Sequence, residues 1–251
     1  MSTLFIPKDG RLVPFRDSPV EADLRRSADE VAQSMERMVN SEDYPCIAAI
    51  RSFAKDEYYV GLYPSFGTGR SAGQLARDLL VYRDHHRESR SPYLSFWAVF
   101  PETGEFTEAE FETRLWHELS CAVSHEVRNG NDPMSSWDPA FSPHPEDRNF
   151  CFSLGGSAFF VVGLHAGSSR ISRRFPHPTL IFNVYEQFTQ LMDEGKYDPM
   201  VRINRLKDLR FQGTVNPMAE KYGVEWEAIQ FSGSENPSDW KCPFQHGAKP
   251  K

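Results

Sequence analysis

The chain has 251 residues, of which 39% are hydrophobic and 25% are charged, and its formal net charge at pH 7 is −7. This composition excludes a disordered chain and is sufficient for one sizeable core, so we expect a single domain over residues 1–251. The negative charge argues against a general nucleic-acid or anionic-membrane surface, and no stretch approaches the roughly 20 apolar residues of a membrane helix. The N-terminus lacks the apolar core of a signal peptide, so we expect a cytoplasmic protein without nucleic acid or membrane as partners.

Three helices are predicted in the first half of the chain. Residues 20–39 carry apolar side chains at near-helical spacing with charges between them, which is typical of an amphipathic helix packed on a core. A second helix is predicted over 74–86, after a Gly- and Ser-rich loop at 65–73 that lacks the lysine of a P-loop. A capping box at 107–110 opens the third helix, which runs to about residue 129.

Apolar runs rich in β-branched and aromatic residues predict strands between and after these helices. The predicted strands are 58–62, 92–100, 158–164 and 179–184. Two further helices are predicted at 186–192 and 197–209. Because strands and helices alternate without a regular βαβ repeat, we predict an α+β fold with a mixed or mainly antiparallel sheet flanked by helices.

The four cysteines are Cys46, Cys121, Cys151 and Cys242. Their wide spacing contains no CxxC pair, so we expect neither a zinc knuckle nor a disulfide framework. Most are expected to be buried thiols, and Cys46 begins a mostly apolar element over 46–55. Cys242 differs because a Cys-Pro dipeptide near the C-terminus can offer a thiolate to haem iron. A packed terminal segment anchored by aromatic neighbours is the alternative.

The stretch 152–175, FSLGGSAFFVVGLHAGSSRISRRF, holds the densest group of reactive side chains. His165 directly follows a predicted strand, and Ser168 and Ser169 provide a turn and a helix N-cap. Three arginines follow at helical spacing, on one face of a short predicted helix: Arg170, Arg173 and Arg174. Imidazole is a common ligand of haem iron and clustered arginines bind carboxylates, so the pattern fits a haem with two propionates. A structural histidine beside a solvated arginine-rich turn is the alternative.

The helix predicted at 107–129 carries His117, Glu118 and His125 between apolar positions. The HExxH spacing of zinc enzymes is absent, so core or rim roles are expected for both histidines. A loop with several prolines follows at 130–148. Long loops of this kind in compact domains often form the lid or wall of a site.

A series of short motifs spans nearly the whole chain in order. The motifs are Tyr44-Pro45-Cys46, Pro92-Tyr93-Leu94-Ser95-Phe96, Trp116-His117-Glu118-Leu119, Phe152-Ser153-Leu154-Gly155-Gly156, Gly163-Leu164-His165, Ser168-Ser169-Arg170, Arg173-Arg174-Phe175, Phe182-Asn183, Glu186-Gln187-Phe188, Gln212-Gly213, Asn216-Pro217 and Trp240-Lys241-Cys242-Pro243-Phe244. This series resembles the YqcI/YcgG family. Members of known activity are haem-dependent N-oxygenases, including the L-arginine N-hydroxylase of D-cycloserine biosynthesis and a guanidine N-hydroxylase of the guanitoxin pathway. The family usually has proline after the histidine, where this chain has Ala166.

The resemblance implies haem b in a largely apolar cleft. His165 is the expected axial ligand of the iron, with Ser168 and Ser169 and the three arginines Arg170, Arg173 and Arg174 as the haem-binding segment. His117 and Cys242 are the rival ligands. A thiolate would push electron density onto the iron and favour O–O cleavage, so the identity of the ligand bears on the mechanism.

The implied reaction inserts one oxygen atom into an N–H bond of a small guanidine or amine, L-arginine or a relative. The oxygen comes from O2 with an electron donor, or from peroxide. The electron donor is compatible with a redox partner protein. A homodimer is also compatible with the resemblance. A guanidinium substrate calls for a carboxylate in a bidentate arrangement. Glu118 and Glu186 are the catalytic candidates within the motifs and Asp138 is a third, each with a structural role on a helix or cap as its alternative.

Two other classes of function stay open. The first is a haem-binding or gas-sensing protein without turnover, which the same ligands would permit. The second is a haem-free module that binds an anionic metabolite at the turn of Ser168, Ser169 and Arg170. There is no GxSxG motif and no glycine loop with its lysine, so hydrolase and kinase functions are not expected.

Overall fold

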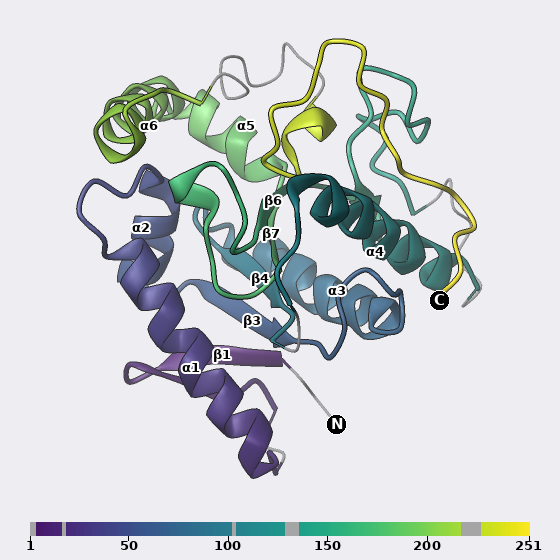
Figure 1. Cartoon of the computed structure of the whole chain (residues 1–251), viewed down its shortest axis with the longest axis horizontal. Coiled ribbons are helices and arrows are strands. Elements are labelled where there is room, and N and C mark those ends of the chain that lie inside the picture. The colour runs from purple at the N-terminus through teal and green to yellow at the C-terminus, as the bar shows by residue number, and fades with distance from the viewer. Residues whose placement is uncertain (1–3, 17–18, 102–103, 129–135, 217–226) are drawn as a thin grey trace.

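A twisted sheet with helices on both sides forms the framework of the protein (Figure 1). The structure, a computed structural model, describes residues 4–16, 19–101, 104–128, 136–216 and 227–251. The strands are β1 (Leu4–Lys8), β2 (Arg11–Pro14), β3 (Tyr58–Leu62), β4 (Ser95–Val99), β5 (Ser153–Leu154), β6 (Ser157–Leu164) and β7 (Thr179–Val184). The helices are α1 (Ala22–Val39), α2 (Ile47–Ala54), α3 (Ala72–Ser89), α4 (Glu108–Arg128), α5 (Glu186–Asp193) and α6 (Tyr197–Gln212). The short 3-10 helices are η1 (Ile171–Arg173) and η3 (Glu227–Gln230).

The strand order across the sheet is β2-β1-β3-β4-β7-β6-β5. Only the β3–β4 pair is parallel among the described strands, and α3 forms the crossover that a parallel pair requires. The other pairs are antiparallel. The predicted α+β fold with a mixed, mainly antiparallel sheet is therefore confirmed. None of the helices in the described ranges has the length and apolar run that crossing a membrane requires.

The hairpin of β1 and β2 was not predicted from the sequence. It turns at Asp9 and Gly10, whose φ angles are 50° and 73°. An Asp-Gly pair with two positive φ angles is the preferred connection of a two-residue hairpin. The hairpin extends the sheet beyond β3 and ends it at β2.

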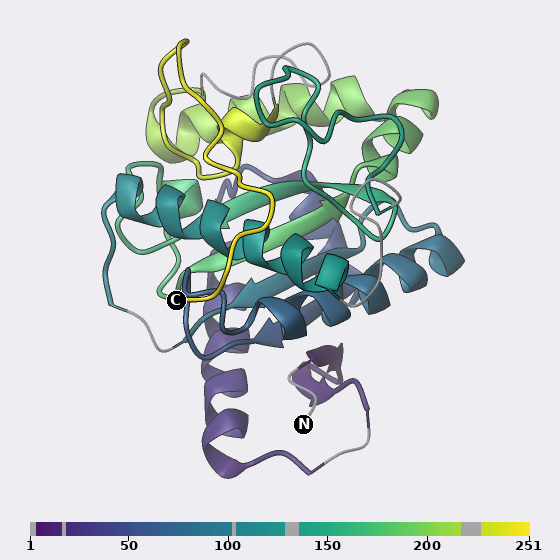
Figure 2. The ribbon, with the colours of Figure 1, turned by 90° about the vertical axis from the view of Figure 1, so that its right-hand side faces the viewer.

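Side chains alternate between the two faces of the sheet, so each central strand contributes to two cores. We call the side covered by α3 and α4 the aromatic face, defined by Phe96, Phe159 and Phe182. Tyr82 of α3 packs on Phe96 and Phe159, with ring centroids 5.9 and 6.2 Å away. Figure 2 shows α3 and α4 running side by side across this face.

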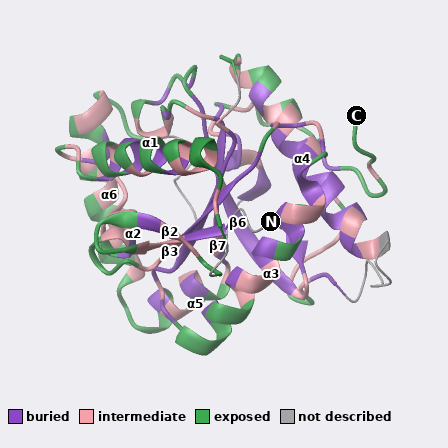
Figure 3. Cartoon of the chain, turned by 90° about the horizontal axis from the view of Figure 1, so that it is seen from below, coloured by how far each residue is buried: buried purple, intermediate pink, exposed green. Residues whose placement is uncertain are grey.

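The opposite side, which we call the cleft face, is defined by Trp97, Ile181 and Asn183. Helix α1 covers one part of it through Val31 and Met35, which are fully buried. Helix α6 packs against α2 and α5 over the other part. Figure 3 shows that β6 and β7 are buried between the layers, whereas α1 exposes its outer side.

The arginine-rich helix predicted after His165 is wrong. The segment forms η1, a 3-10 turn of three residues that starts after Arg170, which has extended backbone angles. The arginines do not share a face, because each donates hydrogen bonds to a different part of the protein. The bond from Arg170 to Asp208 joins residues that are far apart in the sequence, so a local pattern could not predict it.

Candidate functional site

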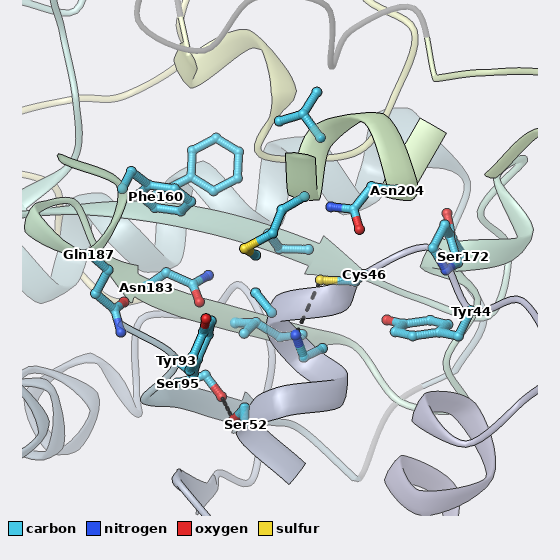
Figure 4. Close-up of a pocket in the computed structure, with 18 of the residues that line it drawn as sticks. Tyr44, Cys46, Ser52, Tyr93, Ser95, Phe160, Ser172, Asn183, Gln187 and Asn204 are labelled. Atoms are coloured by element: carbon cyan, nitrogen blue, oxygen red, sulfur yellow. Dashed lines mark hydrogen bonds between the residues drawn. The ribbon is translucent and has the colours of Figure 1, made fainter. Parts of the chain in front are cut away.

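A cleft lies over the cleft face of the sheet, between α2, α5 and α6 (Figure 4). The space open to water inside it is about 280 Å³. This volume is close to the lower end of the range for small-molecule sites, which runs from roughly 300 to 1,000 Å³. Its walls combine aromatic and aliphatic side chains with a few polar groups, as ligand sites usually do.

The floor of the cleft follows from strand alternation. Trp97 of β4 pairs with Ile181 of β7, and both side chains line the cleft. Asn183 lies two residues further along β7 on the same side. Phe182, which lies between Ile181 and Asn183 in β7, points to the aromatic face. A polar side chain among apolar neighbours on a central strand therefore faces the cavity.

Cys46 lines the cleft at the start of α2. It is the N-cap residue, and its Sγ accepts a hydrogen bond from the backbone N–H of Ala49 at 3.4 Å. Burial raises the pKa of this thiol, while the amides of Ala49 and Ala48 and the guanidinium of Arg173 act in the opposite direction. Cys46 is a neutral thiol in a position where a helix start and a cation favour its anionic form.

Arg173 is the cation of the cleft. It is half-buried, and its Nη1 donates to the carbonyl of Gly163 at 3.1 Å. No carboxylate in the described residues lies within 4.0 Å of it, which sets it apart from the buried pair of Arg170 and Asp208. Burial lowers its pKa, and the neighbouring Tyr44 side chain opposes that change. The guanidinium is therefore suited to a carboxylate that enters with a ligand.

Two residues of the cleft wall each carry a buried acceptor that has no partner among the described residues. Gln187 donates through Nε2 to the carbonyls of Ser91 and Leu94, at 3.0 and 2.8 Å, and its Oε1 accepts no hydrogen bond. Asp208 uses Oδ2 for Arg170 at 2.6 Å, and its Oδ1 has no partner. The two residues as a whole are 3% and 7% exposed. Both oxygens are buried within the wall, so they would meet the N–H or O–H donors of a ligand only if their side chains turned towards the cavity. Unmet buried acceptors are costly, which favours such a change when a donor is present.

His165 lies outside this cleft. It directly follows the end of β6 and is buried, and its ring stacks on Phe111 with centroids 4.4 Å apart. Burial lowers its pKa, and the backbone carbonyl of Phe106 and the Glu108 carboxylate act in the opposite direction. The packing beside it is dense, since a Cβ on Gly167 would lie 2.5 Å from the carbonyl oxygen of Phe106. His165 as an iron ligand stays a prediction.

The other residues predicted to bind the cofactor are mostly engaged within the protein. Arg170 pairs with Asp208, and Arg174 donates to the carbonyl of Ser168 at 2.8 Å. Ser169 donates through its hydroxyl and its amide to Glu108, at 2.7 and 3.0 Å. Arg173 is the member of this predicted set that lines the cleft.

The predicted catalytic carboxylates also lie elsewhere. Glu118 is fully buried and accepts hydrogen bonds from the amides of Gly67 and Gly69, at 3.1 and 3.0 Å. The glycine-rich loop thus holds an internal carboxylate where a P-loop would hold phosphate. Burial raises the pKa of Glu118 to about 7. Glu186 is exposed on the first turn of α5, whereas its neighbour Gln187 faces the cleft.

The rival ligands and the third carboxylate are also remote from the cleft. The Nε2 of His117 lies 3.7 Å from the Sγ of Cys121, and burial raises the pKa of Cys242 to about 12. Asp138 accepts from the amides of Ala140 and Ala158, both at 3.0 Å. Residues 129–135, the start of the loop predicted as a lid, lie outside the described residues.

Sequence reasoning missed most of the cleft residues, although the motifs contained them. Cys46, Tyr93, Asn183 and Gln187 all lie in motifs that carry the family resemblance, and all line the cleft. The available signal was the placement of polar side chains within otherwise apolar motifs. The convergence of those motifs on one cavity depends on the tertiary fold.

Comparison with known proteins places this site in a family. The YqcI/YcgG family profile matches residues 35–245, a range that includes all the residues that line the cleft. No curated protein and no solved structure matches the chain. The match covers more than half of the sequence, so the chain belongs to the YqcI/YcgG family.

Proposed function

We propose that the protein is a haem-dependent N-oxygenase that hydroxylates a guanidine or amine nitrogen of a small, amino-acid-like substrate in the cleft. The observation that carries this proposal is the largely apolar cleft over the sheet, whose wall combines the thiol of Cys46 with the guanidinium of Arg173. Guanidines and amines are rich in N–H donors, which the buried acceptors Gln187 Oε1 and Asp208 Oδ1 of the wall would take once these side chains turn into the cavity. Family membership supports the haem-dependent part of the proposal.

The donor set of the cleft fits a haem. A haem needs a protein ligand for iron, an apolar slot for its macrocycle and cations for its propionates. The cleft offers the thiol of Cys46, the side chains of Trp97, Phe160 and Ile181, and the guanidinium of Arg173, which has no carboxylate within 4.0 Å in the described part of the chain. When bound, haem would supply the oxygen chemistry, using O2 with an electron donor, or peroxide.

The protein's own residues would bind and orient the substrate. Asp208 Oδ1 and Gln187 Oε1 would accept N–H groups of the substrate and hold its reacting nitrogen in one orientation. Orientation of this kind lowers the barrier of the reaction. The apolar side chains would exclude water, strengthening these hydrogen bonds. Arg173 would pair with a propionate.

The test is turnover of hemin-loaded protein with L-arginine, other guanidines and simple amines, with O2 and a reductant or with peroxide. We expect mass spectrometry to detect a product one oxygen atom heavier for a guanidine or amine. Asp208→Asn should raise the KM roughly 10- to 100-fold, as expected for a lost hydrogen bond to a charged group.

Asp138→Asn is the matched control, because this carboxylate is outside the cleft and should leave the KM unchanged. A haem-loaded protein that yields no N-hydroxylated product from any guanidine or amine would favour the sensing function. A protein that takes up no hemin would contradict the proposal and favour the anion-binding module.

A further inference from the structure

Cys46 differs from the other cysteines in its surroundings. Cys121 and Cys151 are buried in the core of the aromatic face, and Cys242 packs against that core near the C-terminus. Cys46 lines the cleft and is partly exposed to it. Figure 4 shows its sulfur directed into the cavity, towards the side on which Asn183 lies.

The local structure prepares this sulfur to act as an anionic ligand. As the N-cap of the eight-residue helix α2, it receives the Ala49 amide hydrogen bond at 3.4 Å. That bond fixes the direction of the sulfur. The helix N-terminus, in addition, stabilises the negative charge of a thiolate. Hydrogen bonds to a ligand atom also orient it and tune the bound metal.

Independent features show that the cavity in front of Cys46 is built for a ligand. Gln187 and Asp208 line the same cavity as the sulfur, and each carries within the wall a buried acceptor that has no partner among the described residues. Arg173, also in the wall, has no carboxylate within 4.0 Å in those residues and would pair with an anionic group. A cysteine that only filled core space would not need these groups around it.

We propose that the Sγ of Cys46 is the protein ligand of the haem iron, an assignment that rests on the proposed function. Ligation forms a bond between sulfur and iron and releases the thiol proton to solvent, and neither atom changes its oxidation state. With this ligand the haem would lie in the cleft beside α2. With His165 as the ligand it would lie at the end of β6, where His165 is packed against Phe111. A thiolate is also the ligand type that the oxygen chemistry of N-hydroxylation favours.

The experiment is a set of hemin titrations of the full chain, read by absorption spectra of the ferric protein and of the ferrous protein under carbon monoxide, and by electron paramagnetic resonance. The variants are Cys46→Ser and Cys46→His, with Cys242→Ser as the matched cysteine control and His165→Ala as the rival. Thermal melts of each apoprotein establish that it is folded. None of these readouts depends on turnover.

We expect the wild type and Cys242→Ser to show the long-wavelength Soret band of a thiolate–carbonyl complex. Cys46→Ser should lose that band, and Cys46→His should replace it with a histidine-type spectrum. If Cys46→Ser fails to fold, Cys46→His and the wild-type resonance spectrum still decide the assignment.

A histidine-type spectrum in the wild type, lost in His165→Ala and unchanged in Cys46→His, would overturn the assignment and leave the proposed function standing. A thiolate spectrum without any hydroxylated product would support Cys46 as the ligand and contradict the N-oxygenase. Absence of hemin binding to the wild type would refute both.

Discussion

The aromatic face and the cleft face belong to the same strands but are built for different purposes. On the aromatic face Phe182 contacts Phe96 and Phe159, with ring centroids 5.8 and 6.1 Å apart, and α3 and α4 close over them. On the cleft face Ser95 and Asn183 occupy neighbouring positions of β4 and β7, and a cavity remains above them. One sheet thus stabilises the fold on one side and leaves room for a ligand on the other.

The contrast between adjacent residues of β7 gives the largest expected effect. Phe182→Ala removes a fully buried ring and should reduce the free energy of unfolding by about 3–5 kcal/mol. Asn183→Ala, one residue further on, should change it by less than about 0.5 kcal/mol while weakening ligand binding. Urea denaturation of both variants measures this difference, and equal losses would break the comparison.

The buried ion pair beside the cleft comes next. Arg170 and Asp208 lie 2.6 Å apart with side chains 10% and 9% exposed. Asp208→Ala leaves the guanidinium buried without its partner and should cost about 3 kcal/mol of stability. The double variant Arg170→Met/Asp208→Leu should recover most of this loss in the same denaturation assay. A double variant as unstable as the single one would show that the charge is not the cause.

A pH dependence is expected on the aromatic side of the molecule. Burial raises the pKa of Glu118 from 4.5 to about 7, so the folded state holds its proton more tightly than the unfolded state. The stability that this proton contributes is present below pH 4.5 and is lost as the pH rises to about 7.

Glu118→Gln keeps an acceptor for the amides of Gly67 and Gly69 and should flatten this part of the pH profile. Thermal melts of both proteins below pH 4.5 and above pH 7 measure the difference. Parallel profiles in the wild type and the variant would show that Glu118 does not titrate in this range.

The smallest predicted effect is at the start of α4. Thr107 and Glu110 form the predicted capping box, with Thr107 N–H donating to Glu110 at 2.9 Å and Glu110 N–H donating to Thr107 Oγ1 at 3.3 Å. Thr107→Ala should cost about 1 kcal/mol, without any change in ligand binding. A thermal melt measures the loss of stability, and a hemin titration tests whether ligand binding is unchanged. Weaker hemin binding would mean that the two faces are coupled.

The sequence predicted the framework better than the site because the framework depends on local patterns. The period of apolar residues in 20–39 and the capping box at 107–110 correspond to α1 and the start of α4. The hairpin at Asp9 and Gly10 could have been predicted from the same kind of signal.

The cleft could not be read from spacing. Cys46 lines the same cavity as Arg173 and Asp208, which are more than a hundred residues away in the sequence. The packing of α2 and α6 over the sheet brings these segments together. The motif that contains Glu118 gives no indication that the partners of this carboxylate are the backbone amides of the glycine-rich loop. Local reasoning therefore selected reactive side chains without showing which of them meet.

The assembly of the cleft from distant segments links ligand binding to global unfolding. Its lining comes from residues 44–52, 92–97, 160–162, 172–183, 187–216 and 230, so no short fragment of the chain contains it. A ligand that binds only the folded state stabilises it by mass action, by about 2.7 kcal/mol at a hundred times its Kd. The thermal midpoint of the protein should therefore rise with the concentration of any true ligand, and a simple melt can rank candidate compounds before an assay for turnover exists.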